Sequence, residues 1–444
     1  MLITKNTDFN YLSAVKFMLD RDISIVIADA AAVKRQIDLV FHHSHEREVE
    51  KDAGESPPAA PNHSVIGLVD NLILRAVSLS ASDIHLEPFE NFMAVRFRID
   101  GILRPETNIK KNLIPAVVSR IKILSGLDIA EKRRPQDGRL RFAAENRTID
   151  IRVSVLPTDF GEKIALRLLD KSSLKLGLNS LGFQGDDLQL FKKNIELPNG
   201  IVLITGPTGS GKTTTLYAAL DYIKSADINI TTIENPIEYN IEGVNQTQIK
   251  PEIDLTFASS LKAILRQDPD VIMIGEIRDR ETLQIALRAS LTGHLVFSTV
   301  HTNDSISTVA RLVDLGAKGY LLAPGLKLIV AQRLVRKICP YCKTDDISPQ
   351  ERQAAARLNL PGHINVQAGT GCARCLSIGF RGRTAIYEML PIDNEIAKII
   401  LNSDDRHEIM NVLEKRGLPT LRDKGIALIK SGITTPSEIL RETT

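Results

Sequence analysis

The stretch Gly206-Pro-Thr-Gly-Ser-Gly-Lys-Thr213 decides the fold, because it matches the pattern G-x-x-x-x-G-K-[ST] in full. Before it, residues 201–205 form a short apolar run rich in β-branched side chains, which predicts a buried strand. After it, residues 213–224 place apolar side chains at helical spacing, which predicts a helix with one apolar face. The glycine-rich segment therefore joins a strand to a helix, which is the context in which this pattern binds phosphate.

A loop of this composition can hold a nucleotide through its own backbone. The glycines let N–H groups close around phosphate oxygens, and the helix N-terminus adds partial positive charge. We expect Lys212 to reach the β- and γ-phosphates of ATP and Thr213 to ligate Mg²⁺ through its hydroxyl. The alternative is a glycine-rich turn without a ligand. The residues expected to contact the nucleotide are Gly206, Pro207, Thr208, Gly209, Ser210, Gly211, Lys212, Thr213 and Thr214.

Length and composition limit the number of domains and the kinds of partner that this protein can have. A chain of 444 residues is expected to hold two to four domains. A net charge of +2 provides no strong overall field that would attract nucleic acid or a membrane. No apolar run reaches the roughly 18 residues that a membrane span needs, and the first ten residues lack the apolar core of a signal peptide. We therefore expect a cytoplasmic protein that meets membranes only through partner proteins.

The four cysteines of the chain form two C-x-x-C pairs, Cys339 with Cys342 and Cys372 with Cys375. In a reducing cytoplasm, a metal centre is favoured over disulfides. Four thiolates can surround one Zn²⁺ and leave no open position, which predicts structural rather than catalytic zinc. The gap between the pairs is longer than the commonest zinc-ribbon spacing, and unoccupied thiols or a redox site are the alternatives.

Carboxylates follow two further predicted strands. Glu276 comes just after the apolar run 271–274, at the strand end that faces the ligand in a doubly wound sheet. We expect Glu276 to activate or position the attacking water. The aspartate usual in a Walker B strand is absent here, since Gly275 precedes Glu276. We therefore expect Glu234 and Glu238, just past the strand 229–233, to assist the metal, with two solvated turn residues as the alternative.

A histidine ends the next apolar run. His301 follows Ser298 and Thr299 at the end of the predicted strand 295–300, where a sensor of the γ-phosphate would lie. The alternative is a core histidine with its hydrogen bonds satisfied by neighbours.

Together with other motifs, these runs resemble the bacterial secretion ATPases that drive type II secretion and type IV pilus assembly. The resemblance extends from about residue 65 to the C-terminus. The motifs that carry it are Leu265-R-Q-D-P-D-V-I-M-I-G-E-I-R-D279, Ala81-S-D-I-H-L-E-P88, Arg134-P-Q-D-G-R139, Gly161-E-K-I-A-L-R-L-L-D170 and Ala331-Q-R-L-V-R336.

The resemblance implies an architecture and a set of partners. A smaller N-terminal domain precedes a RecA-like ATPase domain, six subunits form a ring, and ATP lies between the two domains. Arg152 and Arg167 match arginines that reach the phosphates. The cysteine module is similar to that of secretion and pilus-extension ATPases rather than of retraction ATPases. The implied partners are an inner-membrane platform protein and a membrane recruitment protein facing the cytoplasm, which would place the chain peripherally at the inner membrane.

We therefore expect an α/β protein with a mixed N-terminal domain, a RecA-like P-loop ATPase domain, a small zinc-binding module and a helical tail. Strands that alternate with helices from about residue 186 predict a parallel sheet covered by helices on both faces. The expected segments are a strand-and-helix unit at 1–44, a linker at 45–64, the mixed α/β domain at 65–170, a second linker at 171–185, the ATPase domain at 186–444, the cysteine module at about 337–385 and the helical region at 394–444.

Two departures from the family pattern leave alternatives open. The family usually has Glu-Asp-Pro where this chain has Glu234-Asn235-Pro236, so one carboxylate fewer lies near the expected metal. A scaffold that binds ATP but scarcely hydrolyses it is therefore one alternative. The region before Val65 is shorter than the family's recruiting domain, which fits either a short pilus-type member or a truncated chain.

A RecA-like motor acting on nucleic acid is the other alternative. The near-neutral charge, the absence of tryptophan and an aromatic content of 5% argue against it, because base stacking needs aromatic side chains. No nucleic-acid partner is therefore expected.

Overall fold

A computed structural model describes residues 2–3, 26–27, 65–144, 147–169, 177–183, 185–362, 364–402 and 406–443. The chain divides into two compact units, Met1–Asn62 and His63–Thr444. In the first unit, the short strands β1 (Leu2–Ile3) and β2 (Val26–Ile27) pair in parallel. The rest of the predicted unit at 1–44 and the predicted linker at 45–64 lie outside the described residues.

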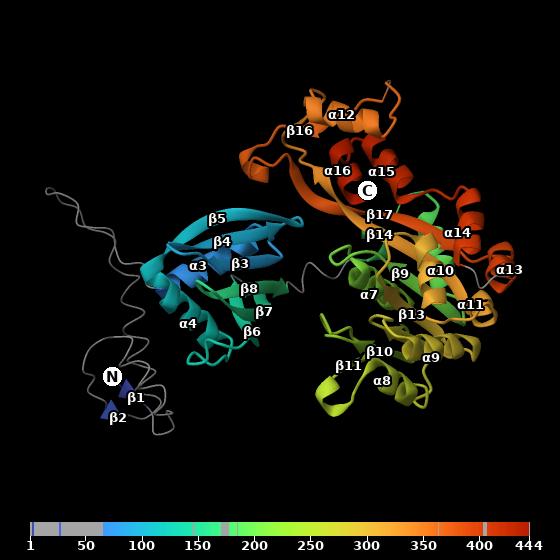
Figure 1. Cartoon of the computed structure of the whole chain (residues 1–444), viewed down its shortest axis with the longest axis horizontal. Coiled ribbons are helices and arrows are strands. Elements are labelled where there is room, and N and C mark those ends of the chain that lie inside the picture. Colours follow the sequence, from blue (N-terminus) through green and yellow to red (C-terminus); the bar gives the residue numbers. More distant parts are fainter. Residues whose placement is uncertain are drawn as a thin grey trace. The chain divides into compact units, whose positions relative to one another are not determined.

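An antiparallel six-stranded sheet occupies the first part of the second unit, with the strand order β5-β4-β3-β8-β7-β6 (Figure 1). Along β4, buried and half-buried side chains alternate, because successive residues of a strand point to opposite faces. Asp100 and Gly101 have positive φ angles of 48° and 85°, as a tight turn between two strands requires. The strands are β3 (Asp83–Pro88), β4 (Phe92–Ile99), β5 (Ile102–Lys110), β6 (Gln136–Ala144), β7 (Arg147–Thr158) and β8 (Gly161–Leu169).

Helices α3 (Val65–Ser78) and α4 (Ile114–Leu124) pack against each other and share one apolar core with this sheet. Lys122 of α4 is buried in that core and forms an ion pair with Glu162 of β8. Its ammonium also donates a hydrogen bond to the Glu131 carbonyl at 2.7 Å. A buried lysine needs such partners, because an unpaired charge in an apolar core is strongly destabilising.

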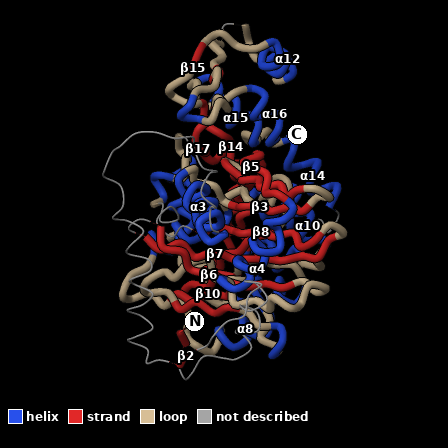
Figure 2. Tube along the Cα trace, turned by 90° about the vertical axis from the view of Figure 1, so that its left-hand side faces the viewer, coloured by secondary structure: helices blue, strands red, loops and turns tan. Residues whose placement is uncertain are grey.

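The remaining strands build a seven-stranded sheet with the order β11-β10-β12-β13-β9-β14-β17. In Figure 2 the strands of the molecule are drawn in red and the helices in blue. All neighbours are parallel except β14 and β17, so the predicted parallel pairing is wrong for this last pair. The reason is that β17 returns directly alongside β14 after the cysteine module, without a crossover helix. The strands are β9 (Gly200–Thr205), β10 (Ile230–Glu234), β11 (Asn245–Gln248), β12 (Val271–Ile274), β13 (Leu295–Val300), β14 (Leu326–Ile338) and β17 (Phe380–Pro391).

Helices cover both faces of this sheet, as predicted. In β9, Ile201 and Leu203 belong to one apolar core while Val202 and Ile204 belong to the other, because side chains alternate between faces. The first core includes α8 (Phe257–Ile264), α9 (Arg280–Leu291), α10 (Ser305–Asp314), α11 (Gly319–Gly325), α13 (Asn394–Asn402) and α14 (Arg406–Lys415). The second includes α6 (Asp187–Ile195) and α7 (Lys212–Ile223).

The cysteine module is inserted between β14 and β17. It contains β15 (Lys343–Thr344) paired with β16 (Ala368–Gly369), and the helix α12 (Pro349–Arg357). Helices α15 (Leu421–Lys430) and α16 (Pro436–Thr443) share a further small core with β14 and β17. The short 3₁₀ helices are η1 (Lys111–Leu113), η2 (Leu178–Ser180), η3 (Pro251–Ile253) and η4 (Ala373–Cys375).

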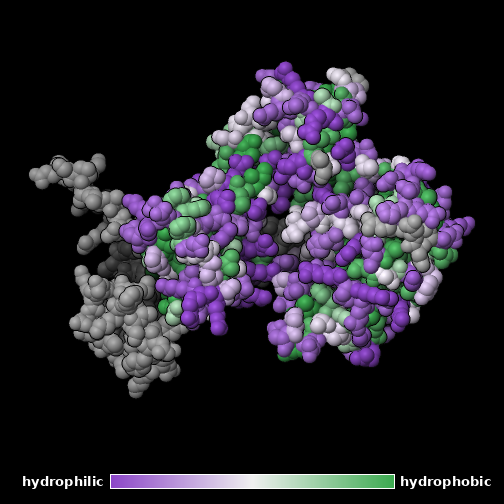
Figure 3. Space-filling view, viewed as in Figure 1, coloured by the Kyte–Doolittle hydropathy of each residue, from purple (hydrophilic) through white to green (hydrophobic). Residues whose placement is uncertain are grey.

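Most of the surface visible in Figure 3 is hydrophilic, with smaller apolar areas between the charged side chains. Among the described residues, no helix is both long and apolar enough to cross a membrane. The predicted domain boundaries remain predictions.

Candidate nucleotide site and metal centre

Four segments meet at one edge of the seven-stranded sheet because their parallel strands end there. The phosphate loop follows β9, Glu234 ends β10, Glu276 follows β12, and His301 follows β13. Ligands of doubly wound sheets bind at this carboxyl edge. The strand order therefore brings together residues that lie far apart in the sequence.

The phosphate loop adopts a conformation that only glycine accommodates well. Gly206, Gly209 and Gly211 have φ angles of 145°, 83° and 90°. A Cβ atom on Gly206 would lie 2.5 Å from the carbonyl oxygen of Gln332, so space is lacking there as well. Gly211 is the N-cap of α7, so the helix begins with its free N–H groups at the loop. The loop and helix are therefore built as an anion site.

Lys212 closes the loop onto itself. Its Nζ donates hydrogen bonds to the carbonyl oxygens of Gly206 at 2.7 Å and Pro207 at 3.1 Å. Burial lowers the pKa of Lys212 to about 8, against the opposing effect of Glu276. Within the described residues, Ser210 Oγ is buried in the loop without a hydrogen-bond partner. A buried ammonium and an unsatisfied hydroxyl in one glycine loop fit the oxygens of a polyphosphate.

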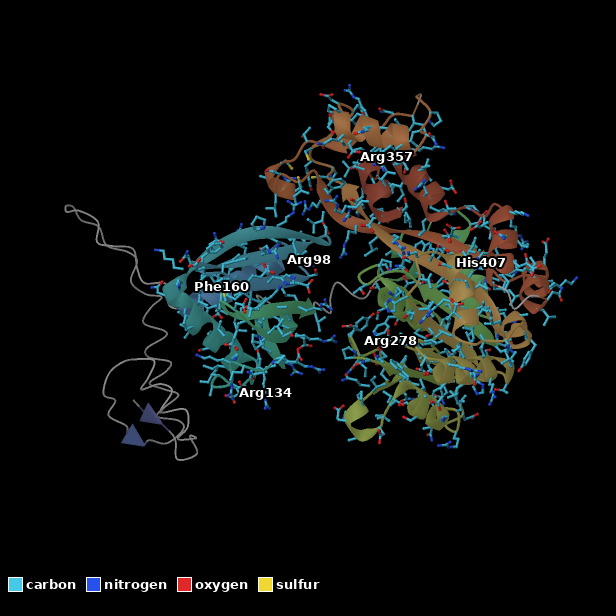
Figure 4. The ribbon with its side chains drawn as sticks, viewed as in Figure 1. Arg98, Arg134, Phe160, Arg278, Arg357 and His407 are labelled. Atoms are coloured by element: carbon cyan, nitrogen blue, oxygen red, sulfur yellow. The ribbon has the colours of Figure 1, made fainter. Side chains whose placement is uncertain are left out.

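Glu276 lies at the centre of a charged group. Its Oε2 is 2.6 Å from Arg278 Nε and 3.3 Å from His301 Nε2. The Glu276 side chain is 13% exposed, whereas that of Arg278, which Figure 4 labels, is 70% exposed. The structure thus places His301 beside Glu276, and Lys212 close enough for the Glu276 carboxylate to act on its pKa. Arg278 lies beside them.

The backbone around Glu276 is held by both neighbouring strands. The N–H of Gly275 donates to Ile233 O at 2.7 Å, and that of Ile277 donates to Thr299 O at 2.9 Å. The Thr299 hydroxyl donates to Gly275 O at 2.7 Å. Rigid positioning of this kind suits a residue that must orient a water molecule.

Glu234 is buried in a hydrogen-bond network rather than open to solvent. It accepts hydrogen bonds from Tyr217 Oη, from Thr232 Oγ1 at 2.6 Å and from Gln246 Nε2 at 2.9 Å. Burial, together with the Glu234 carboxylate, raises the pKa of Tyr217. Tyr217 also accepts a hydrogen bond from the Glu238 N–H at 3.3 Å. Sequence reasoning missed Tyr217 because it occurs within the apolar pattern of α7.

The two predicted arginines have different partners. Arg152 Nη2 is 3.1 Å from Glu238 Oε2 and donates to Ile237 O at 3.1 Å, so it contacts the segment that follows β10. Arg167 Nε donates to Asp83 at 3.0 Å within the six-stranded sheet. Arg152 is therefore placed beside one of the predicted metal-assisting glutamates, and Arg167 is placed beside an aspartate of its own sheet.

The four cysteines lie together in an arrangement that could hold one metal ion. Their ligand atoms all lie within 4.8 Å of one another. The Sγ–Sγ distances are 3.9 Å for Cys339–Cys372, 3.8 Å for Cys342–Cys375 and 3.7 Å for Cys372–Cys375. Four sulfurs at the Zn–S distance of about 2.3 Å in a tetrahedron are about 3.8 Å apart. The residues therefore fit one zinc ion.

Backbone N–H groups prepare Cys375 for metal binding. Its Sγ accepts hydrogen bonds from the N–H groups of Cys372 at 3.1 Å and Gly379 at 3.3 Å. Burial opposes the thiolate, but these two donors and the thiols of Cys372 and Cys342 together outweigh it, and the pKa of Cys375 is lowered to about 6. A thiolate is the form that ligates metals.

Comparisons with known proteins agree with this geometry. The profile of the family described as "Type II/IV secretion system protein" matches residues 59–441. The chain belongs to this secretion protein family. The type II secretion system protein E of Pseudomonas aeruginosa is 44% identical over 435 residues, which cover 98% of this chain and 85% of that protein. The type IV pilus assembly ATPase PilB of Myxococcus xanthus is 42% identical over 450 residues, which cover 97% of this chain and 79% of that protein.

A solved structure is also similar. The crystal structure of the pilus retraction motor PilT with bound ADP is 28% identical, has a TM-score of 0.56, and covers 84% of this chain and 96% of that chain. These matches confirm the predicted family, the α/β fold class and the activity of an ATPase. The roles of individual residues remain predictions.

Proposed function

We propose that this member of the secretion protein family is a Mg²⁺-dependent ATPase that powers the assembly of pilin-like subunits in type II secretion or type IV pilus extension. The observation that carries the proposal is the convergence of Lys212, Glu276 and His301 at the carboxyl edge of the large sheet. Both processes appear in the names of the relatives, type II secretion in one and type IV pilus assembly in another.

Each residue of the site has a part in the proposed hydrolysis. The loop from Gly206 to Gly211 binds phosphate oxygens through backbone N–H groups, and Lys212 stabilises negative charge on the β- and γ-phosphates. Glu276 accepts a hydrogen bond from the attacking water and orients it toward the γ-phosphate. His301, 3.3 Å from Glu276, donates to a γ-phosphate oxygen and so couples that phosphate to the base.

Magnesium would be held by Thr213, with Glu234 and Glu238 assisting, and it would neutralise part of the negative charge of the phosphates. Thr213 is exposed on the first turn of α7. Glu238 contacts Arg152, so a nucleotide that attracts this arginine would also free the Glu238 carboxylate.

The active form in this proposal is a homohexamer at the cytoplasmic side of the inner membrane. Arg152 and Arg167 compensate the charge of the phosphates as the domains close. The cysteine module, which fits zinc, is the docking surface for a platform protein of the membrane. A membrane recruitment protein is a further proposed partner.

The test is ATP turnover against protein concentration with Mg²⁺, with an Arg152→Ala variant measured beside the wild type. Specific activity that rises with concentration and is lost in the variant supports a site completed by assembly. Activity that is independent of concentration and unaffected by the variant would remove both the hexamer and the arginine role from the proposal.

A further inference from the structure

The strand β14 lies directly beside the strand that leads into the phosphate loop. Ala331 of β14 pairs with Thr205, the last residue of β9, so the next residue, Gln332, lies alongside the loop itself. Gln332 is 2% exposed. Its Nε2 donates to the Ser210 carbonyl at 2.8 Å, and its Oε1 accepts from Thr215 Oγ1 at 2.8 Å. One side-chain amide therefore links the loop to the helix that follows it.

This link fixes the direction of a loop peptide. The Ser210 carbonyl and the Gly211 N–H belong to the same peptide unit, and in a trans peptide they point in opposite directions. Because Gln332 holds the carbonyl toward β14, the Gly211 N–H points away from β14. An amide suits this position because it offers a donor and an acceptor at a set separation.

The packing around Gln332 leaves no room for the loop to shift toward it. A Cβ atom on Gly211 would lie 2.8 Å from Gln332 Nε2, and one on Gly206 would lie 2.5 Å from Gln332 O. The loop is thus in contact with Gln332 at both of its ends.

The next residue, Arg333, contacts the second loop of the site. Its Nη2 donates to the Asn303 carbonyl at 2.7 Å, two residues after His301. Consecutive residues of β14 therefore hold the phosphate loop and the histidine loop.

We infer that Gln332 is a positioning residue that keeps the phosphate loop in its phosphate-binding conformation without touching the nucleotide. The inference rests on the proposed nucleotide site at this loop. Its specific consequence is that Gln332 contributes to the binding of the β-phosphate, which the loop contacts, and not to binding of the nucleoside.

The test is the affinity of Gln332→Met and Gln332→Glu variants for Mg²⁺–ADP and for AMP, measured by calorimetry. Methionine retains the length of the side chain but leaves the Ser210 carbonyl unsatisfied. Loss of such a bond to a buried carbonyl corresponds to roughly a 5- to 100-fold weaker ADP binding. The glutamate variant should bind ADP more weakly still, because its carboxylate oxygen faces the carbonyl and adds negative charge beside the phosphates. AMP affinity should change less than about twofold, and KM for ATP should rise more than kcat falls.

Val335→Ala is the matched control. Val335 is fully buried on β14 and contributes to the core of α15 and α16, so its truncation destabilises the same strand away from the loop. ADP binding that stays within twofold of wild type in both Gln332 variants would overturn the inference. Equal losses of ADP binding in Gln332→Met and Val335→Ala would also overturn the inference. They would indicate that a general loss of stability, rather than a change at the phosphate loop, weakens ADP binding.

A Lys212→Ala variant separates this inference from the function on which it rests. If Lys212→Ala loses ADP binding while the Gln332 variants retain it, only the role of Gln332 fails. If Lys212→Ala also binds ADP normally, the proposed site itself fails. Should the methionine variant not fold, the glutamate variant provides the same comparison.

Discussion

The phosphate edge of the large sheet and the cysteine module obtain their geometry in different ways. At the phosphate edge, hydrogen bonds and core packing from β9, β10, β12, β13 and β14 hold the loops in place. In the cysteine module, the described secondary structure is a pair of two-residue strands, the helix α12 and the 3₁₀ helix η4. The four cysteines of this module come from two separate chain segments, and their sulfur atoms lie close enough together to hold one metal ion.

The difference shows what each region depends on. The phosphate edge is preorganised by the fold and should persist without a ligand, because its backbone bonds belong to a buried sheet. The cysteine module buries few apolar side chains of its own, so a metal ion would supply much of its stability. Changes at the first region should therefore affect chemistry, and changes at the second should affect local structure.

The largest expected effect is on catalysis at the phosphate edge. Glu276→Gln should reduce ATP turnover by about 10²- to 10⁴-fold while ATP binding is retained, because an amide cannot act as a general base. Turnover and equilibrium binding of ATP should be measured in parallel. Glu281→Gln, an exposed residue paired with Lys262, is the control. Hydrolysis that survives in Glu276→Gln would make the assigned role wrong.

Loss of a cysteine ligand should affect the cysteine module and leave the phosphate edge unchanged. Cys342→Ser should lower zinc affinity by at least about 100-fold, more than the loss usual for a residue that only supports a ligand. Hydrogen exchange should then increase across residues 339–375, while ADP affinity remains within twofold. Tyr341→Phe, at an exposed position that supplies no sulfur, serves as the control. A parallel loss of ADP binding would show that the two regions are not independent.

Removal of the loop lysine should weaken binding rather than structure. Lys212→Ala should reduce ATP affinity by roughly 10- to 100-fold, because charge-assisted hydrogen bonds to the phosphates are lost. The melting temperature should fall little, since burial of the ammonium already disfavours its charged form. Lys224→Ala, at the other end of the same helix, should bind ATP normally. Unchanged affinity in Lys212→Ala would contradict a preformed phosphate site.

The smallest expected effect concerns the buried network around Glu234. Tyr217→Phe removes one of its donors and should lower the free energy of unfolding by about 1–3 kcal/mol. Tyr222→Phe is a close control, because the Tyr222 hydroxyl donates a hydrogen bond to Glu196 at the surface. Loss of that bond should lower the free energy of unfolding by less than about 0.5 kcal/mol. The free energies of unfolding of the two variants should be compared by thermal unfolding. Equal stabilities would mean that the network is not part of the preorganised edge.

Sequence patterns predicted the local parts of both regions well. The strand, glycine loop and helix around Lys212 occur as expected, because the turn geometry is encoded in adjacent residues. The two cysteine pairs were equally clear, because each pair forms one local turn of the chain. The antiparallel pairing of β14 with β17 was missed, because the long insertion between them hides their adjacency.

Contacts between distant segments were decided by the tertiary fold. Gln332 meets Ser210, and Tyr217 meets Glu234, only because strand order places their segments side by side. Glu276 and His301 were recognisable from their runs, but their 3.3 Å separation depends on the parallel pairing of β12 and β13. Local backbone preferences act between neighbours in sequence, so short stretches of the sequence were enough to predict the local structure. Hydrogen-bond partners across the sheet depend on register and packing, which no short stretch of the chain contains.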